Sequence, residues 1–191
     1  MSALLSLARI ASLIAVIYGC AAPLPSRAQS QPPQPAQFAI ARSGVAFVTG
    51  DTWIQNNQTF RLYGVQSCIR GTQFTNVTSG GTDCGEASIA YFAALIRDTS
   101  PVCTPIFQVG TPPTVYVVCQ AHIGAATLDL GAIIITQGFG FASSAVDGAN
   151  TRPVYLPYSV AEADAKGHKR GLWAGTFTHP VTALSKVQES R

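Results

Sequence analysis

The chain has 191 residues, which is enough for one domain of ordinary size and too few for two. It contains 12 Lys and Arg against 9 Asp and Glu, and only 11% of its residues are charged. This composition lacks the basic excess expected of a protein that holds nucleic acid mainly by neutralising phosphates, so nucleic acid is weakly supported as a partner.

The first 28 residues have the layout of a secretory signal peptide. Arg9 supplies a positive charge, the apolar run Ile10–Ile17 follows, and Ser26-Arg27-Ala28 fits the small-x-small rule of signal peptidase. The run is too short for a stable membrane span. We therefore expect a periplasmic or secreted protein without a transmembrane anchor, and cleavage leaves 10 basic and 9 acidic residues, close to neutrality.

Two other interpretations of this segment stay open. Ile17-Tyr18-Gly19-Cys20 resembles a lipobox, in which Cys20 would be lipidated and retained, although Tyr18 is bulky for that motif. The apolar run could instead be a helix packed within the fold. Residues 29–37 are rich in Pro and Gln and read as an extended linker.

Alternating apolar residues predict strands from Phe38 to Phe47, at Thr52–Ile54 and at Thr59–Val65, separated by turn-forming residues. Gly71–Gly81 is expected to be an irregular polar loop, because it is crowded with Gly and Thr. Val102–Val109 and Val115–Ala121 are expected to form a hairpin around Gly110-Thr111-Pro112-Pro113.

Four cysteines follow the signal, and four cysteines allow three pairings. In the predicted hairpin Cys103 and Cys119 lie opposite each other, which leaves Cys68 to pair with Cys84. Zinc binding is the alternative, but no two of these cysteines have the C-x2-4-C spacing of a zinc site. Disulfides agree with export from the reducing cytoplasm.

Three short helices are expected, at residues 86–96, 130–137 and 158–170, with Asp129 near the N-terminus of the second. Ser143–Pro157 reads as less regular. The inward stripe of the last helix is predicted to be Ala161, Ala165, His168 and Leu172. Strands interleaved with helices in this order indicate an α+β fold, mainly β, built as a small antiparallel barrel with helices packed against it.

Several segments, taken together and in order, resemble the staphylococcal-nuclease-like (thermonuclease) family from about Phe38 to Phe177. The shared motifs are Thr49-Gly50-Asp51-Thr52, Phe60-Arg61-Leu62-Tyr63-Gly64-Val65, Cys84-Gly85-Glu86-Ala87, Leu128-Asp129-Leu130-Gly131-Ala132, Gln137-Gly138-Phe139-Gly140-Phe141-Ala142, Ala161-Glu162-Ala163-Asp164-Ala165-Lys166 and Arg170-Gly171-Leu172-Trp173-Ala174. The resemblance implies an OB fold, a five-stranded antiparallel barrel, for residues 38–177, followed by a tail at 178–191.

Active members of the family hydrolyse phosphodiesters with one Ca2+ held by two aspartates and a carbonyl, a glutamate acting on water, and two arginines on the phosphate. Asp51 matches the first metal aspartate, and Arg61 matches the first arginine. The other family positions are changed in this chain; they fall on Gln66 (second aspartate), Ser67 (carbonyl donor), Ile69 (glutamate) and Thr114 (second arginine). The resemblance therefore implies impaired catalysis and no bound cofactor.

Structural roles compete with functional ones at the two retained positions. Asp51 fits equally well as a turn residue that caps local N–H groups, and Arg61 as an ion-pair partner. Asp83 or Glu86 could supply a displaced carboxylate. His122, His168 and His179 lie on different predicted elements, which argues against a histidine site.

Three functions remain as hypotheses. The first is an exported, non-catalytic nuclease-like module that binds a polysaccharide or an envelope protein, since the layout also resembles exported nuclease-like proteins of rhizobial succinoglycan (exopolysaccharide) gene clusters. The second is a secreted Ca2+-dependent nuclease acting on DNA or RNA through a displaced carboxylate. The third is a structural or interaction domain without a small ligand.

Overall fold

The computed structural model describes residues 36–76, 80–147 and 150–189, all within one unit, Pro35–Arg191. The predicted signal peptide, Cys20 and all but the last two residues of the predicted linker lie outside the described residues. Within the described part, no helix is both long and apolar enough to cross a membrane.

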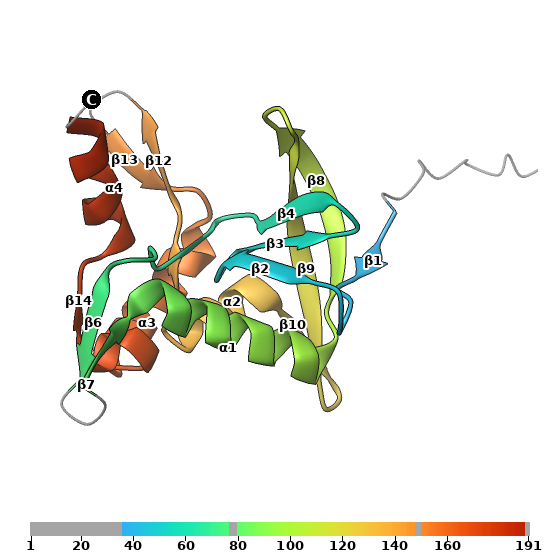
Figure 1. The fold of residues 1–191 in the computed structure, drawn as a ribbon. Coiled ribbons are helices and arrows are strands. Elements are labelled where there is room, and N and C mark those ends of the chain that lie inside the picture. Colours follow the sequence, from blue (N-terminus) through green and yellow to red (C-terminus); the bar gives the residue numbers. More distant parts are fainter. Residues whose placement is uncertain (1–35, 77–79, 148–149, 190–191) are drawn as a thin grey trace, which may run out of the picture. The chain divides into compact units, whose positions relative to one another are not determined.

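The main sheet has the order β1-β8-β9-β4-β3-β2 and is curled (Figure 1). Its strands contribute the buried Trp53, Leu62 and Val117 to the larger hydrophobic core. Strands β2 (Ala46–Thr49), β3 (Thr52–Gln55) and β4 (Gln58–Leu62) form an antiparallel meander. β4 then pairs in parallel with β9 (Thr114–Ile123), whose far edge carries β8 (Val102–Val109) and then β1 (Phe38–Ala39). β10 (Ala126–Asp129) also pairs with β9. The structure is thus an α+β fold with a curled, half-barrel sheet.

The hairpin of β8 and β9 confirms the cysteine prediction. Cys103 and Cys119 are register partners and form a disulfide with both residues buried. The second disulfide joins Cys68 to Cys84, also buried. The turn between the strands holds the expected Gly110-Thr111-Pro112-Pro113. Glycine favours this turn because it adopts a positive φ without strain, as Gly110 does at +85°, and proline favours it because its ring restricts φ.

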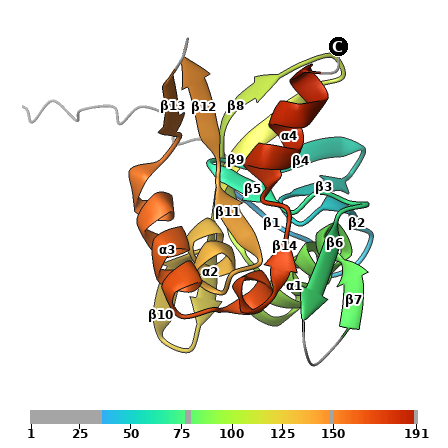
Figure 2. The same cartoon turned by 90° about the vertical axis from the view of Figure 1, so that its left-hand side faces the viewer.

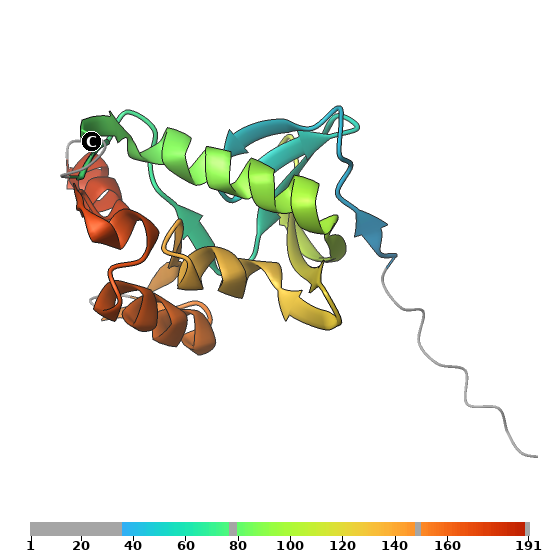
Figure 3. The ribbon, with the colours of Figure 1, turned by 90° about the horizontal axis from the view of Figure 1, so that it is seen from below.

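Helix α1 (Cys84–Thr99) crosses the sheet next to β2 (Figure 3). It begins at the N-cap Asp83, whose carboxylate accepts from the N–H of Glu86 at 3.0 Å. Its fully buried Phe92 contacts the rings of Trp53 and Phe47 at 5.7 and 5.6 Å between centroids. Successive side chains of a strand point to opposite faces of the sheet, and Phe47 and Trp53 point to the face that α1 covers. The three rings therefore pack between α1 and the sheet.

The last third of the chain covers one end of the sheet. Helix α2 (Leu130–Thr136) is largely buried and is capped by Asp129, whose carboxylate accepts from the N–H of Ala132 at 2.7 Å, as predicted. Helix α3 (Leu156–Gly167) packs against α2 (Figure 2). A 3-10 turn (Gly171–Ala174) and β14 (Thr176–Phe177) then lead to α4 (Pro180–Glu189).

Two segments that were predicted to be irregular are hairpins. Within 71–81, β6 (Gln73–Asn76) pairs with β7 (Gly80–Asp83), and β14 joins them as a third strand. Within 143–157, β12 (Ser144–Asp147) pairs with β13 (Asn150–Pro153). Backbone pairing with a facing strand outweighs the weak β propensity of the Gly, Asn, Asp and Pro residues in these segments, which is why the local sequence pattern missed both hairpins.

The helix predictions need three corrections. The structure has four α-helices among its described residues rather than about three, since α4 lies inside the predicted tail. The last predicted helix ends at Gly167, before a short turn, and not at Arg170. His168 does not face inward; it is exposed and lies 3.0 Å from Asp164, while Ala165 and Leu172 of the predicted stripe are buried. The chain leaves the helix at His168, so the 3.6-residue period no longer applies there.

Two further strands connect the meander to the last third. β5 (Val65–Ser67) follows β4 after a turn at Gly64 and pairs with β11 (Gly140–Ala142). The predicted single strand at 59–65 is therefore two strands with a bend. This bend carries the chain out of the curled sheet to β5, which holds the predicted site residues Gln66 and Ser67.

Candidate functional site

Asp51 lies in the tight turn between β2 and β3 and is only 1% exposed. The turn rests directly on α1: a Cβ added to Gly50 would lie 2.6 Å from the Cβ of Ser88 and 2.9 Å from its carbonyl carbon. Only glycine permits this approach. The Gly50-Asp51 pair therefore places a carboxylate at the junction of the meander and α1.

The Asp51 carboxylate is saturated by neighbouring donors. It accepts from the hydroxyls of Thr49, of Thr52 at 3.0 Å and of Ser67 at 3.3 Å, and from the Ser67 N–H at 3.4 Å. Arg61 Nη2 lies 3.1 Å from Asp51 Oδ2. A buried carboxylate needs such compensation, because its desolvation is costly.

Arg61 bridges Asp51 to the third predicted position. The same Nη2 donates to Gln66 Oε1 at 2.8 Å, and Gln66 Nε2 donates to the carbonyl of Ser67 at 3.0 Å. The structure thus brings Asp51, Arg61, Gln66 and Ser67 into one hydrogen-bonded network, which we call the Asp51 cluster. In it Asp51 accepts from hydroxyls of its own turn, and the backbone N–H that it accepts from, that of Ser67, is not local, which differs from the predicted capping of local N–H groups. Arg61 is an ion-pair partner, as its structural interpretation expected.

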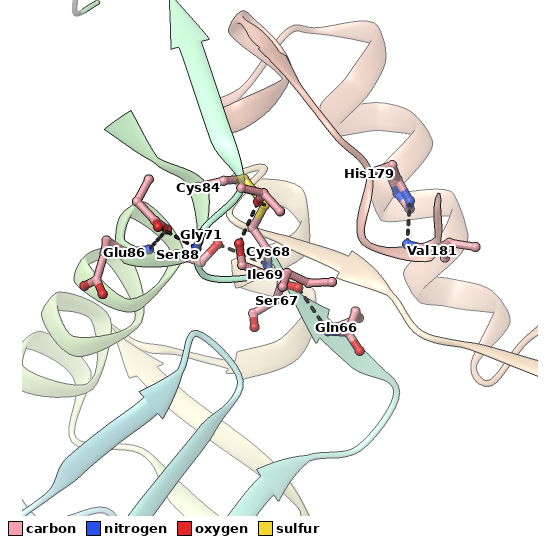
Figure 4. Close-up of a disulfide and its surroundings, with 12 residues drawn as sticks. Gln66, Ser67, Cys68, Ile69, Gly71, Cys84, Glu86, Ser88, His179 and Val181 are labelled. Carbon is pink, nitrogen blue, oxygen red and sulfur yellow. Dashed lines mark hydrogen bonds between the residues drawn. A yellow bond between two sulfur atoms is a disulfide. The ribbon is translucent and has the colours of Figure 1, made fainter. Parts of the chain in front are cut away.

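The Cys68–Cys84 disulfide ties the segment after the Asp51 cluster to the start of α1 (Figure 4). Ile69 follows on this segment and is half-buried, and its carbonyl accepts from the hydroxyl and the N–H of Thr72 at 2.6 and 3.2 Å. The Cys68 N–H reaches Ser88 Oγ at 3.4 Å. The segment at which the resemblance expects a glutamate is a disulfide-held turn with an apolar side chain.

Thr114 lies away from the Asp51 cluster. It is the first residue of β9 and pairs with Thr59, whereas Arg61 of the Asp51 cluster lies two residues further along β4. At about 3.3 Å per residue, Thr114 is therefore offset from Arg61 by roughly 7 Å along the strand. The residue that faces Arg61 across the sheet is Tyr116.

Neither alternative carboxylate joins the cluster. Asp83 caps α1 and also accepts from the Gly71 N–H at 2.6 Å; these hydrogen bonds, that of Glu86 above all, hold the pKa of Asp83 below its ordinary value. Glu86 lies 2.9 Å from Arg70, and both side chains are about half exposed. Both carboxylates are thus engaged around the N-terminus of α1.

The residues of the Asp51 cluster do not fit a calcium ion. Ca2+ takes six to eight oxygen ligands in proteins, with several carboxylates among them. The cluster offers one carboxylate, already paired with a guanidinium, and the amide of Gln66. Among residues 36–76, 80–147 and 150–189, no group of three or more His, Cys, Asp or Glu is positioned to hold a metal.

Two features of the last third were not predicted from the sequence. His179 Nε2 lies 3.0 Å from Glu162 Oε1, and Glu162 Oε2 accepts from the N–H of Ala142, so this pair joins β11, α3 and the start of α4. The second feature is a groove between the sheet and α3, lined in part by Tyr63, Tyr155 and Tyr158. No sequence signal pairs residues so far apart.

Comparison with protein-family models and with curated proteins found no match to this chain. The nuclease-like assignment therefore rests on the sequence motifs and stays a prediction.

Proposed function

We propose that this chain is an exported, nuclease-like protein with an OB fold that does not hydrolyse phosphodiesters. It acts as a binding or accessory factor in an envelope process such as exopolysaccharide (succinoglycan) biosynthesis. The single observation that carries the loss of catalysis is the position of Arg61 Nη2, which lies 3.1 Å from Asp51 and 2.8 Å from Gln66. These are the two positions that the resemblance equates with metal aspartates, and a guanidinium nitrogen fills the space between them.

Electrostatics favours the contact of Arg61 with Asp51 and Gln66 over a cation bound in the same place. A cation entering between Asp51 and Gln66 would have to displace the guanidinium and would gain only one full negative charge in return. The displaced Arg61, 30% exposed in its side chain, would lose its two partners at once. The Asp51 cluster is thus stable as an ion pair without metal.

The other catalytic roles lack suitable side chains. Ile69 cannot take a proton from water, and Thr114 carries no charge to stabilise a phosphate. Ile69 lies in a disulfide-held turn and Thr114 at the start of β9, which supports a structural role for both residues. This argument depends on the family resemblance for the correspondence of positions.

The sheet order supports the OB assignment. In the main sheet the three-stranded meander β2–β4 is followed, after β5–β7 and α1, by the hairpin β8–β9; β4 pairs in parallel with β9, and β1 pairs with β8 at the other edge. The pairing of β1 with β8 brings the start of the described chain next to the strand that follows the meander in the sheet, as closure of a five-stranded barrel requires. The two disulfides are compatible with an exported protein.

The experiment uses protein purified from the periplasm after export of the full chain, with and without Ca2+. We expect no digestion of single- or double-stranded DNA or of RNA above the buffer rate, and no Ca2+-dependent rise in melting temperature. Arg61→Ala serves as the internal control, because a true nuclease activity of this chain would disappear in that variant. Ca2+-dependent turnover that Arg61→Ala abolishes would overturn the proposal.

One observation favours the alternative, a secreted Ca2+-dependent nuclease: a buried carboxylate and an arginine are retained at matching positions and in contact. In that case Ca2+ would stabilise the wild-type protein by mass action, and the stabilisation would grow with Ca2+ concentration. The same melting experiment therefore distinguishes the two functions without an activity assay.

A further inference from the structure

A groove of about 320 Å3 lies between the outer face of the sheet and the start of α3. Its lining combines aromatic, apolar and hydrogen-bonding side chains: Tyr63, Ile106, Val118, Gln120, Asp129, Tyr155 and Tyr158. The volume falls at the lower end of the roughly 300–1,000 Å3 of ligand clefts. None of these seven residues is Lys or Arg.

The aromatic side chains come from both walls. Tyr155 is 47% exposed, and its ring packs edge-on against Tyr158 at 4.9 Å between centroids. On the sheet side Tyr63 contacts Phe107 at 5.8 Å, and Phe107, 43% exposed, stacks on Tyr116 at 4.8 Å. An aromatic row therefore extends from Tyr63, just after the end of β4, across β8 and β9.

Two polar side chains of the groove, Asp129 and Gln120, offer hydrogen-bonding atoms to a ligand. Asp129 Oδ1 accepts from the hydroxyl of Tyr158 at 2.6 Å and from the Ala132 N–H, which leaves Oδ2 as an acceptor. Gln120 is exposed, and its amide has no hydrogen-bond partner among the described residues. Gly64, at φ +73°, lets the wall close: a Cβ there would lie 3.2 Å from the Tyr158 ring.

We propose that this groove binds a neutral saccharide, a short segment of a β-linked pyranose chain. A pyranose ring with equatorial hydroxyls presents flat C–H faces that stack on aromatic rings, and its hydroxyls need donors and acceptors such as Gln120 and Asp129 Oδ2 at the ring edge. The lining has an acidic group and no cation, which disfavours phosphate chains. This ligand class deepens the proposed function and rests on it.

The test measures binding of three neutral hexasaccharides, cellohexaose, laminarihexaose and xylohexaose, to the exported protein by titration calorimetry and NMR. We expect at least one to bind, with tyrosine resonances perturbed and with affinity insensitive to salt between 50 and 500 mM NaCl, as for an uncharged ligand. Tyr155→Ala should raise Kd about tenfold, the loss expected for one stacking contact. Binding of none of the three would overturn the proposal.

Leu156→Ala is the matched control, because Leu156 is the next residue, is 67% exposed and does not line the groove. Its Kd should stay within about twofold of wild type. Equal losses in both variants, or binding of a hexathymidine that is lost at high salt while the sugars do not bind, would also overturn the inference. A nuclease assay on the same preparation separates the two proposals: turnover refutes only the loss of catalysis, and absent sugar binding refutes only the groove.

Discussion

Replacing Arg61 by methionine tests whether the Asp51 cluster is a structural ion pair. Met retains much of the length and apolar stem of the side chain and removes the guanidinium. Asp51, 1% exposed, then loses its ion pair with Arg61, the only positive charge in contact with it among the described residues, and Gln66 loses its donor. The hydroxyls of Thr49, Thr52 and Ser67 remain to compensate the carboxylate.

The magnitude follows from burial and from the remaining partners. Removing one partner of a fully buried ion pair costs about 3–5 kcal/mol, because a charge stays buried without compensation. Here the Arg61 side chain is 30% exposed, so solvent already screens part of the attraction. The retained hydroxyl donors lower the loss further. We therefore expect Arg61→Met to reduce the free energy of unfolding by about 2 kcal/mol.

Urea unfolding of the exported protein, followed by circular dichroism, measures this loss, and Asp51→Asn completes a double-mutant cycle. Asparagine keeps the shape of the side chain without its charge, so the second substitution should recover part of the loss caused by the first. We expect a coupling energy of about 1–2 kcal/mol. A loss below about 0.5 kcal/mol, or losses that simply add, would refute the ion-pair reasoning.

Three further predictions concern stability. Two double variants remove one disulfide each, C68S/C84S and C103S/C119S. Because both bonds have a sequence separation of 16, the chain-entropy model predicts equal losses of about 3 kcal/mol in urea unfolding, and clearly unequal losses would show that packing dominates. Asp83→Ala should cost about 1 kcal/mol at neutral pH through the lost cap of α1. Since its lowered folded pKa makes Asp83 stabilising above about pH 4 and the effect fades as pH falls through that pKa, the difference from wild type should shrink in acid; a constant difference would contradict this. Tyr158→Phe should cost about 1 kcal/mol by removing the buried hydrogen bond to Asp129, and thermal unfolding without any change would exclude that role.

Local sequence signals predicted the parts of the fold that depend on neighbours in the chain. Glycine and proline at 110–113 set the hairpin whose register brings Cys103 to Cys119. Asp129 before an apolar run marked the start of α2, because an N-cap acts within three residues. The second disulfide followed by elimination once the first was assigned.

Other features depend on partners far away in the chain and had no local signal. β6 and β7 form in a sequence of low β propensity because β14, about a hundred residues later, pairs with β6. The short helix α4 is too short to be stable by itself in water, so it needs the tertiary structure. His168 was misassigned because a periodic pattern does not tell where a helix ends.

At the candidate site, the sequence by itself determined which side chains are present: one carboxylate at 51, one arginine at 61, and no second carboxylate or glutamate at 66 and 69. Only the tertiary structure decided that Arg61 turns its guanidinium onto Asp51 and Gln66. It also decided that Tyr63 and Tyr155 line one groove. The physical reason is that residue type sets what a group can do chemically, whereas the distance between groups on different strands and helices is set by packing of the whole core.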